Sequence, residues 1–237
     1  TYIDNGSSFT LEQELPINEG IQTIIISGNF IFVTTPKSGS AEGVKWFKRM
    51  GNKWEYQGLV LEGLNISKAV VEGSKLVALT YWSMLTYSFD GSTWGNTNYF
   101  STNGTNQDVD MDGDYIILGE TTNYYPGTPS IGQARVFHWA GDTWQVEDYL
   151  IPVDTHPDDE YGLSVSIEDG VACVSGPLND SSGSNGGMIA VFRKLDGVWK
   201  YSNRVVPESP VPTMAFGIPV ATDGDAIITC WQADGED

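Results

Sequence analysis

The chain has 237 residues, of which 12 are basic and 31 acidic, giving a formal net charge of −19. A hydrophobic content of 40% with 12% aromatic residues excludes wholesale disorder, and the length is sufficient for a full core. The acidic balance argues against nucleic-acid binding and against attraction to anionic membranes, since both need clustered Lys and Arg, and no apolar run is long enough to insert into a bilayer.

Five segments have the pattern of a tight β-hairpin, in which two apolar runs flank a short turn of Gly, Asn or Asp. They are residues 24–33, 69–79, 109–118, 165–174 and 220–229. A second hairpin follows each of the first four, and its last strand begins with Trp54, Trp94, Trp144 or Trp199. Each pair of hairpins supplies four antiparallel strands, the content of one β-propeller blade. The recurrence of these four tryptophans predicts that they pack between blades.

The fifth of these segments has no second hairpin after it, and the N-terminal residues carry the missing pattern. Gly6 and Phe9 match Gly51 and Trp54 of the first repeat. We therefore predict a single all-β domain, a five-bladed β-propeller whose ring is closed by N-terminal strands that complete the last blade. The predicted blades are 17–60, 61–102, 103–152 and 153–210, with 211–237 joined by 1–16. The alternative is a stretch of a longer array of six or seven blades.

The repeats resemble FG-GAP repeats, the blades of integrin α-subunit-like propellers. In the fourth repeat Tyr161-Gly162 stands for the FG and Ser175-Gly176-Pro177 for the GAP, and Phe216-Gly217 repeats the FG in the fifth. The first three repeats depart from this pattern, with Thr34-Thr35-Pro36 and Leu118-Gly119-Glu120 at the GAP position. The resemblance implies a propeller with a recognition role in a secreted or surface protein, and it leaves the ligand open.

Calcium is the usual cofactor of that family, and Asp108, Asp110 and Asp112 with Gly113 have the alternating carboxylates of a calcium loop. The family loop has a further acidic ligand at its ninth position, where this chain has Ile116. The other interpretation places Asp108 and Asp110 on an inner strand of the third blade, next to an ordinary hairpin turn. We expect this structural role and no bound cofactor, with calcium as the alternative.

The order of strands predicts where a ligand would bind. In a four-stranded meander the connections between strands 2 and 3 lie on the same side as the connections from one blade to the next. These connections are long and varied here, whereas the other turns are short. Aromatic and polar residues on the long connections form the predicted ligand-binding set: Trp82, Trp231, Tyr124, Tyr125, Asn179 and Asp180.

These features favour a non-catalytic extracellular or cell-surface recognition module that binds carbohydrate or protein through the long-connection face. A structural building block of a larger assembly is one alternative. A glycoside hydrolase is the other, because Asp108, Asp110 and Glu160 can approach a central funnel. The sequence has no GxSxG, HExxH, P-loop or GxGxxG motif, so we expect no enzyme. Cys173 and Cys230 are predicted to be free, buried thiols.

Overall fold

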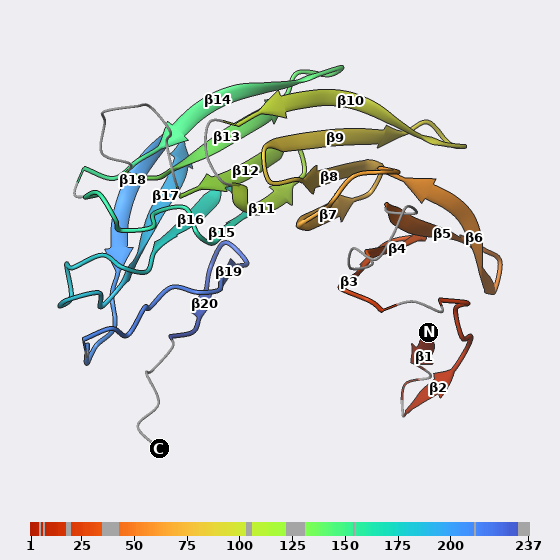
Figure 1. Cartoon of the computed structure of the whole chain (residues 1–237), viewed down its shortest axis with the longest axis horizontal. Helices are drawn as coiled ribbons and strands as arrows, with labels where there is room; N and C mark the ends of the chain where they lie inside the picture. The colour runs from red at the N-terminus through yellow and green to blue at the C-terminus, as the bar shows by residue number, and fades with distance from the viewer. Residues whose placement is uncertain are drawn as a thin grey trace. The chain divides into compact units, whose positions relative to one another are not determined.

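The computed structural model describes residues 1–4, 6, 8–17, 20–34, 43–102, 106–121, 131–153, 155–210 and 212–231. These residues form twenty β-strands in antiparallel sheets, and the chain divides into two compact units, Thr1–Ile66 and Ser67–Asp237 (Figure 1). Among the described residues there is no helix of the length and apolarity needed to cross a membrane.

The first unit contains a hairpin and one four-stranded sheet. The hairpin pairs β1 (Tyr2–Asp4) with β2 (Phe9–Leu11), as the N-terminal sequence pattern predicts. The sheet has the order β3-β4-β5-β6, with strands Thr23–Ser27, Phe30–Thr34, Val44–Met50 and Lys53–Val60. It matches the predicted first blade.

The second unit contains three further four-stranded sheets and a final hairpin, all in the predicted order. The first of these sheets has β7 (Lys68–Glu72), β8 (Lys75–Leu79), β9 (Ser83–Phe89) and β10 (Trp94–Ser101). The next has β11 (Asn106–Asp112), β12 (Tyr115–Glu120), β13 (Gln133–Trp139) and β14 (Trp144–Leu150). The last has β15 (Val165–Glu168), β16 (Val171–Gly176), β17 (Met188–Leu195) and β18 (Val198–Val205). The final hairpin pairs β19 (Val220–Thr222) with β20 (Ile227–Thr229).

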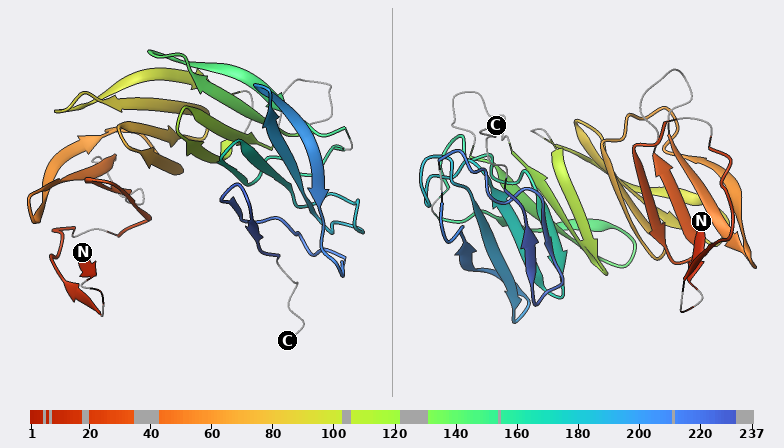
Figure 2. Two further views of the ribbon diagram at one scale, coloured as in Figure 1. Left: turned by 180° about the vertical axis from the view of Figure 1, so that it is seen from behind. Right: turned by 90° about the horizontal axis from the view of Figure 1, so that it is seen from below.

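Each four-stranded sheet is a simple meander with tight turns between strands 1 and 2 and between strands 3 and 4. Glycine in the left-handed region makes these turns possible, for example Gly113 at φ 55° and Gly197 at φ 79°. The right-hand view of Figure 2 shows the tight turns of the lime-green to blue strands at the lower edge of their sheets. The long connections therefore leave from the opposite edge, as the sequence predicts.

The core of the second unit lies between neighbouring sheets. One cluster joins Val77 and Leu79 of β8 to the β11–β14 sheet, including the nearly buried Trp144. Another joins that sheet to the β15–β18 sheet and includes Trp199. The predicted packing role of these two tryptophans is confirmed. Trp54 packs in the first unit with Ile31 and Phe47 and with Leu15 and Ile17 from the segment after β2, whereas the role of Trp94 between blades stays a prediction.

Two amide side chains fix tryptophan backbones in the same way. The Asn98 Oδ1 atom accepts a hydrogen bond from the Trp144 backbone at 3.0 Å, and its Nδ2 donates to Thr143 Oγ1 at 2.7 Å. In the first unit Gln13 Oε1 accepts from the Trp54 backbone at 2.8 Å, and Gln13 Nε2 donates to the Trp54 carbonyl at 2.9 Å. Gln13 follows Phe9 at the interval at which Asn98 follows Trp94, and the segment after β2 packs beside the first sheet.

The aromatic–glycine pairs of the fourth and fifth repeats have a packing role. Tyr161 is fully buried, and Gly162 at φ +94° lies against the β11–β14 sheet so closely that a Cβ would stand 2.5 Å from the Gln133 carbonyl oxygen. Gly217, at φ +113°, follows the buried Phe216. The aromatic ring fills the gap between sheets while glycine permits the backbone to touch the preceding sheet.

The described residues do not show a closed ring. The hairpins β1–β2 and β19–β20 are two separate two-stranded sheets, so closure and the number of blades stay predictions. Neither cysteine forms a disulfide, as expected, and Cys173 is buried. The predicted burial of Cys230 is wrong, because this residue directly follows β20, which pairs with β19 and with no third strand among the described residues.

Candidate functional site

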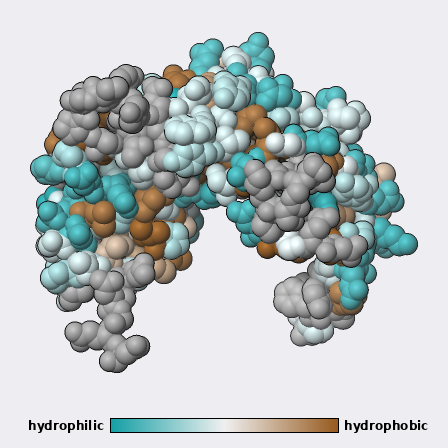
Figure 3. All heavy atoms as spheres, in the orientation of Figure 1, coloured by the Kyte–Doolittle hydropathy of each residue, from teal (hydrophilic) through white to brown (hydrophobic). Residues whose placement is uncertain are grey.

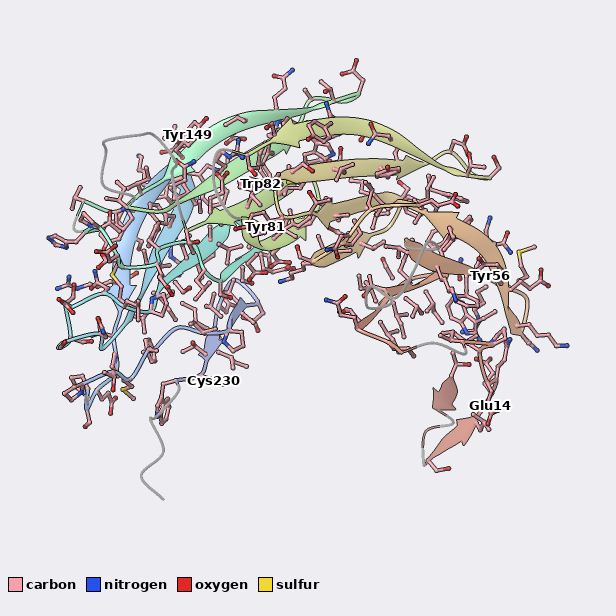
Figure 4. The ribbon with its side chains drawn as sticks, viewed as in Figure 1. Glu14, Tyr56, Tyr81, Trp82, Tyr149 and Cys230 are labelled. Carbon is pink, nitrogen blue, oxygen red and sulfur yellow. The ribbon has the colours of Figure 1, made fainter. Side chains whose placement is uncertain are left out.

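Two exposed aromatic rings stand on the connection between β8 and β9. Tyr81 is 57% exposed and Trp82 61% exposed, and their ring centroids are 4.5 Å apart at an interplanar angle of 86°. This is the edge-to-face arrangement that aromatic pairs favour. Figure 4 shows the two residues side by side at this connection. We call Tyr81 and Trp82 the aromatic platform.

Hydroxyl hydrogen bonds hold the backbone beneath the platform. Thr80 Oγ1 accepts from the Ser83 backbone at 3.1 Å and lies 2.7 Å from Ser83 Oγ, while the Thr80 backbone donates to the Ser83 carbonyl at 2.9 Å. The Trp82 carbonyl accepts from the Thr102 backbone at 3.1 Å. The rings are thus presented by a short, ordered turn, so a ligand that stacks on them loses little conformational entropy of the protein.

A second feature is a pocket of about 440 Å³ formed by the connection after β18 together with Trp231. Met214 and Phe216 are 7% and 8% exposed, whereas Trp231 is 56% exposed. The complete lining is Val206, Pro207, Glu208, Ser209, Met214, Phe216 and Trp231. The pocket is therefore largely apolar, with one carboxylate and one hydroxyl, and its volume is within the range of small-ligand sites.

The remaining predicted ligand residues have different surroundings. Asn179 is 1% exposed, donates from Nδ2 to Asp159 Oδ2 at 2.8 Å and accepts from the Ser181 backbone at 2.9 Å, so it orders the connection between β16 and β17. Asp180 is exposed and accepts from the Asn185 backbone at 2.8 Å. Tyr124 and Tyr125 lie outside the described residues. Sequence reasoning missed Tyr81, although its place beside Trp82 was a usable signal.

The aspartates proposed for calcium bind the backbone of the next inner strand. Asp108 Oδ2 accepts from Ser164 Oγ at 2.9 Å and from the Val165 backbone at 3.0 Å. Asp110 Oδ2 repeats this with Ser166 Oγ at 2.9 Å and the Ile167 backbone at 3.0 Å.

These side-chain contacts form a ladder between the inner strands, and it extends on both sides of β11 and β15. Lys68 of β7 forms an ion pair with Asp108, and Asp112 Oδ2 accepts from the Asp169 backbone at 2.8 Å. The hydroxyl oxygens of Ser164 and Ser166 in turn accept from the Val220 and Thr222 backbones of β19 at 3.2 and 3.1 Å. Side chains thus connect the inner strands β7, β11, β15 and β19.

This ladder favours the structural interpretation of the aspartates over a calcium loop, whose oxygen ligands converge on a single ion. Within the described part of the chain, Asp112 instead gathers with Glu168 and Asp169, whose carboxylate oxygens lie within 4.8 Å of one another. Burial, followed by the negative charges of Asp112 and Asp169, raises the pKa of Glu168 above its ordinary value. The carboxylates here repel one another, so the fold tolerates this charge rather than being stabilised by it.

Comparison with known proteins identifies the fold and leaves the function open. No family model matches the chain, and neither does any curated protein. The N-terminal domain of Nup159 is similar at 12% identity and a TM-score of 0.53, over 84% of this chain and 51% of that one. A Bacteroides uniformis protein assigned as a 6-phosphogluconolactonase is similar at 15% identity and a TM-score of 0.52, over 80% of this chain and 56% of that one.

Both solved structures are β-propellers, and this chain spans about half of the length of each. Together with the four-stranded antiparallel sheets, the likeness defines the class of protein: an all-β chain with the fold of a β-propeller. At these identities the likeness concerns the fold alone.

Proposed function

We propose that this chain is a non-catalytic recognition module that binds carbohydrate or protein through its long-connection face. The observation that carries the proposal is the aromatic platform, in which the rings of Tyr81 and Trp82 lie edge to face and are more than half exposed. Exposed rings on a hydrogen-bonded turn offer a stacking surface for a sugar ring and an anchor for a protein partner. The FG-GAP-like pattern and an extracellular or cell-surface location belong to the same proposal.

The test combines a glycan array and a protein pull-down with single alanine substitutions. Loss of a central aromatic anchor costs about 2 kcal/mol, or about 30-fold in affinity, so Trp82→Ala should weaken binding to any ligand found by about that factor. Tyr149→Ala is the matched control, because Tyr149 is 52% exposed but lies on the outer strand β14 (Figure 4). Blank screens, or ligands that bind Trp82→Ala and Trp231→Ala as well as the parent chain, would refute the proposal.

The absence of catalysis is a proposal too, supported by the carboxylates themselves. Asp108 and Asp110 each bind a hydroxyl and a backbone N–H of β15, which suits a structural acceptor better than a general acid or base. Glu160 is exposed in the connection before β15. If the chain hydrolyses a polysaccharide and Asp108→Asn or Glu160→Gln abolishes that activity, the glycosidase alternative replaces our proposal.

The number of blades is also part of our proposal. Five blades with closure by residues 1–16 remain the arrangement that the sequence predicts. The β1–β2 hairpin and the Gln13–Trp54 hydrogen bonds support the match of Phe9 with the first residue of an outer strand. Hydrogen exchange tests this closure: if residues 1–16 cover β20, the amides of Ile227 and Thr229 should exchange as slowly as those of Ile116 and Leu118, and fast exchange would contradict it.

A further inference from the structure

The aromatic platform stands at an edge of the β7–β10 sheet that carries several hydroxyl groups. Ser67 and Ser101 are exposed at this edge: the Ser67 backbone donates to the Leu79 carbonyl at 2.9 Å, and Ser101 pairs in register with Ser83. Thr80, which holds the turn beneath the rings, adds a further hydroxyl. The two rings are therefore set among small polar groups.

The charged side chains of this sheet lie away from the platform or are paired. Glu72, Lys75 and Asp90 are at or beside the tight turns, which lie at the opposite edge of the sheet. The remaining charged residue, Lys68, is at the platform edge, but its ammonium forms an ion pair with Asp108. Among the described residues of this sheet, the edge thus offers no free cation to a carboxylate or sulfate and no free anion to a cationic segment.

The two rings of the platform form a corner rather than one flat surface. Their planes are 86° apart, so a flat group that stacks on one ring stands perpendicular to the other. The face of an aromatic ring is negative and attracts the weakly positive C–H groups on the face of a sugar ring. Within the described residues, the Tyr81 hydroxyl, the Trp82 indole N–H and the Ser101 hydroxyl have no hydrogen-bond partner. The corner therefore combines a stacking face with free hydrogen-bonding groups, which a sugar ring can use together.

A protein partner fits these surroundings less well than a sugar. A specific protein interface buries roughly 800 Å² on each side and has an apolar core, with the anchor residues near its centre. In the view of Figure 3, the hydrophobic residues of the described chain form small groups between hydrophilic ones rather than a broad apolar surface. Hydroxyl groups beside two exposed rings suit a ligand that is itself rich in hydroxyls.

We propose that the aromatic platform binds an uncharged sugar unit of a neutral glycan. One C–H face of the sugar stacks on an exposed ring, and its hydroxyls form hydrogen bonds with the Tyr81 hydroxyl, the Trp82 indole N–H and the Ser101 hydroxyl. Acidic glycans are disfavoured, because they find no free cation in this sheet and the net charge of −19 repels them. This inference rests on the function proposed above and names the ligand class of the same site.

A glycan array of matched pairs tests the ligand class, with each neutral glycan presented beside its sialylated, sulfated or uronic-acid counterpart. We expect the bound glycans to be neutral, with at least about tenfold weaker binding to each acidic counterpart. Calorimetric titration with a bound neutral glycan should give a dissociation constant that changes less than about twofold between about 0.05 and about 0.5 M NaCl, since no ion pair is screened. Preferential binding of acidic glycans, or a larger effect of salt, would overturn the inference.

Single substitutions locate the sugar on the platform. Trp82→Phe keeps a stacking face and should weaken binding less than about fivefold, against about 30-fold for Trp82→Ala. Tyr81→Phe and Ser101→Ala each remove one neutral hydrogen bond and should weaken binding about two- to tenfold. Ser74→Ala is the matched control, because Ser74 is an exposed serine of the same sheet at its opposite edge. If Tyr81→Phe and Ser101→Ala both bind the glycan like the parent chain, its hydroxyls are not recognised here and the inference fails.

Parallel screens for glycans and for proteins separate failure of this inference from failure of the proposed function. Binding of neutral glycans that Trp82→Ala weakens supports both. If no glycan binds, but a protein partner is captured whose binding Trp82→Ala weakens, the sugar inference is overturned and the recognition function stands. If neither glycans nor proteins bind in a way that depends on Trp82, both are overturned.

Discussion

The carboxylate ladder along the inner strands makes a quantitative prediction at Asp108. This side chain accepts from Ser164 Oγ and the Val165 backbone, forms an ion pair with Lys68, and belongs to a residue that is 8% exposed. Asp108→Ala removes all of these acceptors at once. The buried Val165 N–H loses its carboxylate partner, and the Lys68 ammonium loses its counter-ion.

The expected loss in the free energy of unfolding is large for a single substitution. Hydrogen bonds to a charged group contribute roughly 1.5–3 kcal/mol each, so two of them give about 3–6 kcal/mol. Water entering beside Lys68 recovers part of this, which brings the expected loss to about 3 kcal/mol. Asp108→Asn keeps one acceptor oxygen and should lose less than half as much.

Urea unfolding followed by tryptophan fluorescence measures the loss, because Trp144 and Trp199 lie in the clusters between sheets. With a urea slope of about 2 kcal/mol per molar, a loss of 3 kcal/mol lowers the midpoint by about 1.5 M. Glu208→Ala, at an exposed residue of the same unit, is the control. If Asp108→Ala is no less stable than this control, the ladder does not stabilise the fold and the structural interpretation of the aspartates is refuted.

Three further predictions concern a glycine, the thiols and a carboxylate. Gly162→Ala should cost about 1–3 kcal/mol more than Gly197→Ala in urea unfolding: both glycines have positive φ, but a Cβ meets backbone atoms only at Gly162. A thiol reagent should modify Cys230 quickly and Cys173 only on unfolding, because burial raises the pKa of Cys173 to about 11; two fast thiols would contradict this. The raised pKa of Glu168 means that the folded state holds this proton more tightly, so the free energy of unfolding falls as pH rises from 4.5 through the folded pKa. Glu168→Gln should flatten that fall in urea titrations at several pH values, and an unchanged slope would contradict the repulsion.

The blades were predictable because their signals are local. A Gly or Asp turn between two apolar runs fixes a hairpin whatever surrounds it, and the structure has the four-stranded sheets at the expected places. The order of the strands then follows from the meander, and with it the edge from which the long connections leave. Trp144 and Trp199 were assigned correctly because a large ring that recurs at the start of each outer strand needs a repeated cavity to fill.

The contacts between repeats were not predictable in the same way. The amides of Gln13 and Asn98 act on tryptophans 41 and 46 residues away, and nothing in their neighbouring sequence marks them. The alternation of Asp108 and Asp110 was visible, but it fits a metal loop as well as a strand. The hydroxyls of Ser164 and Ser166 favour the strand, and their hydrogen bonds to the aspartates exist only once the sheets are stacked.

The strongest contrast is between β12 and β20, since almost the same six residues form a buried strand in one place and an exposed edge in the other. Local sequence therefore fixes the hairpin but not its burial, which depends on the sheets that pack on its two faces: Ile116 packs with Val77 and Leu79 of β8, and Ile117 with the β15–β18 sheet. The prediction that Cys230 is buried was wrong for this reason, because it assumed that the thiol has the environment of a central strand.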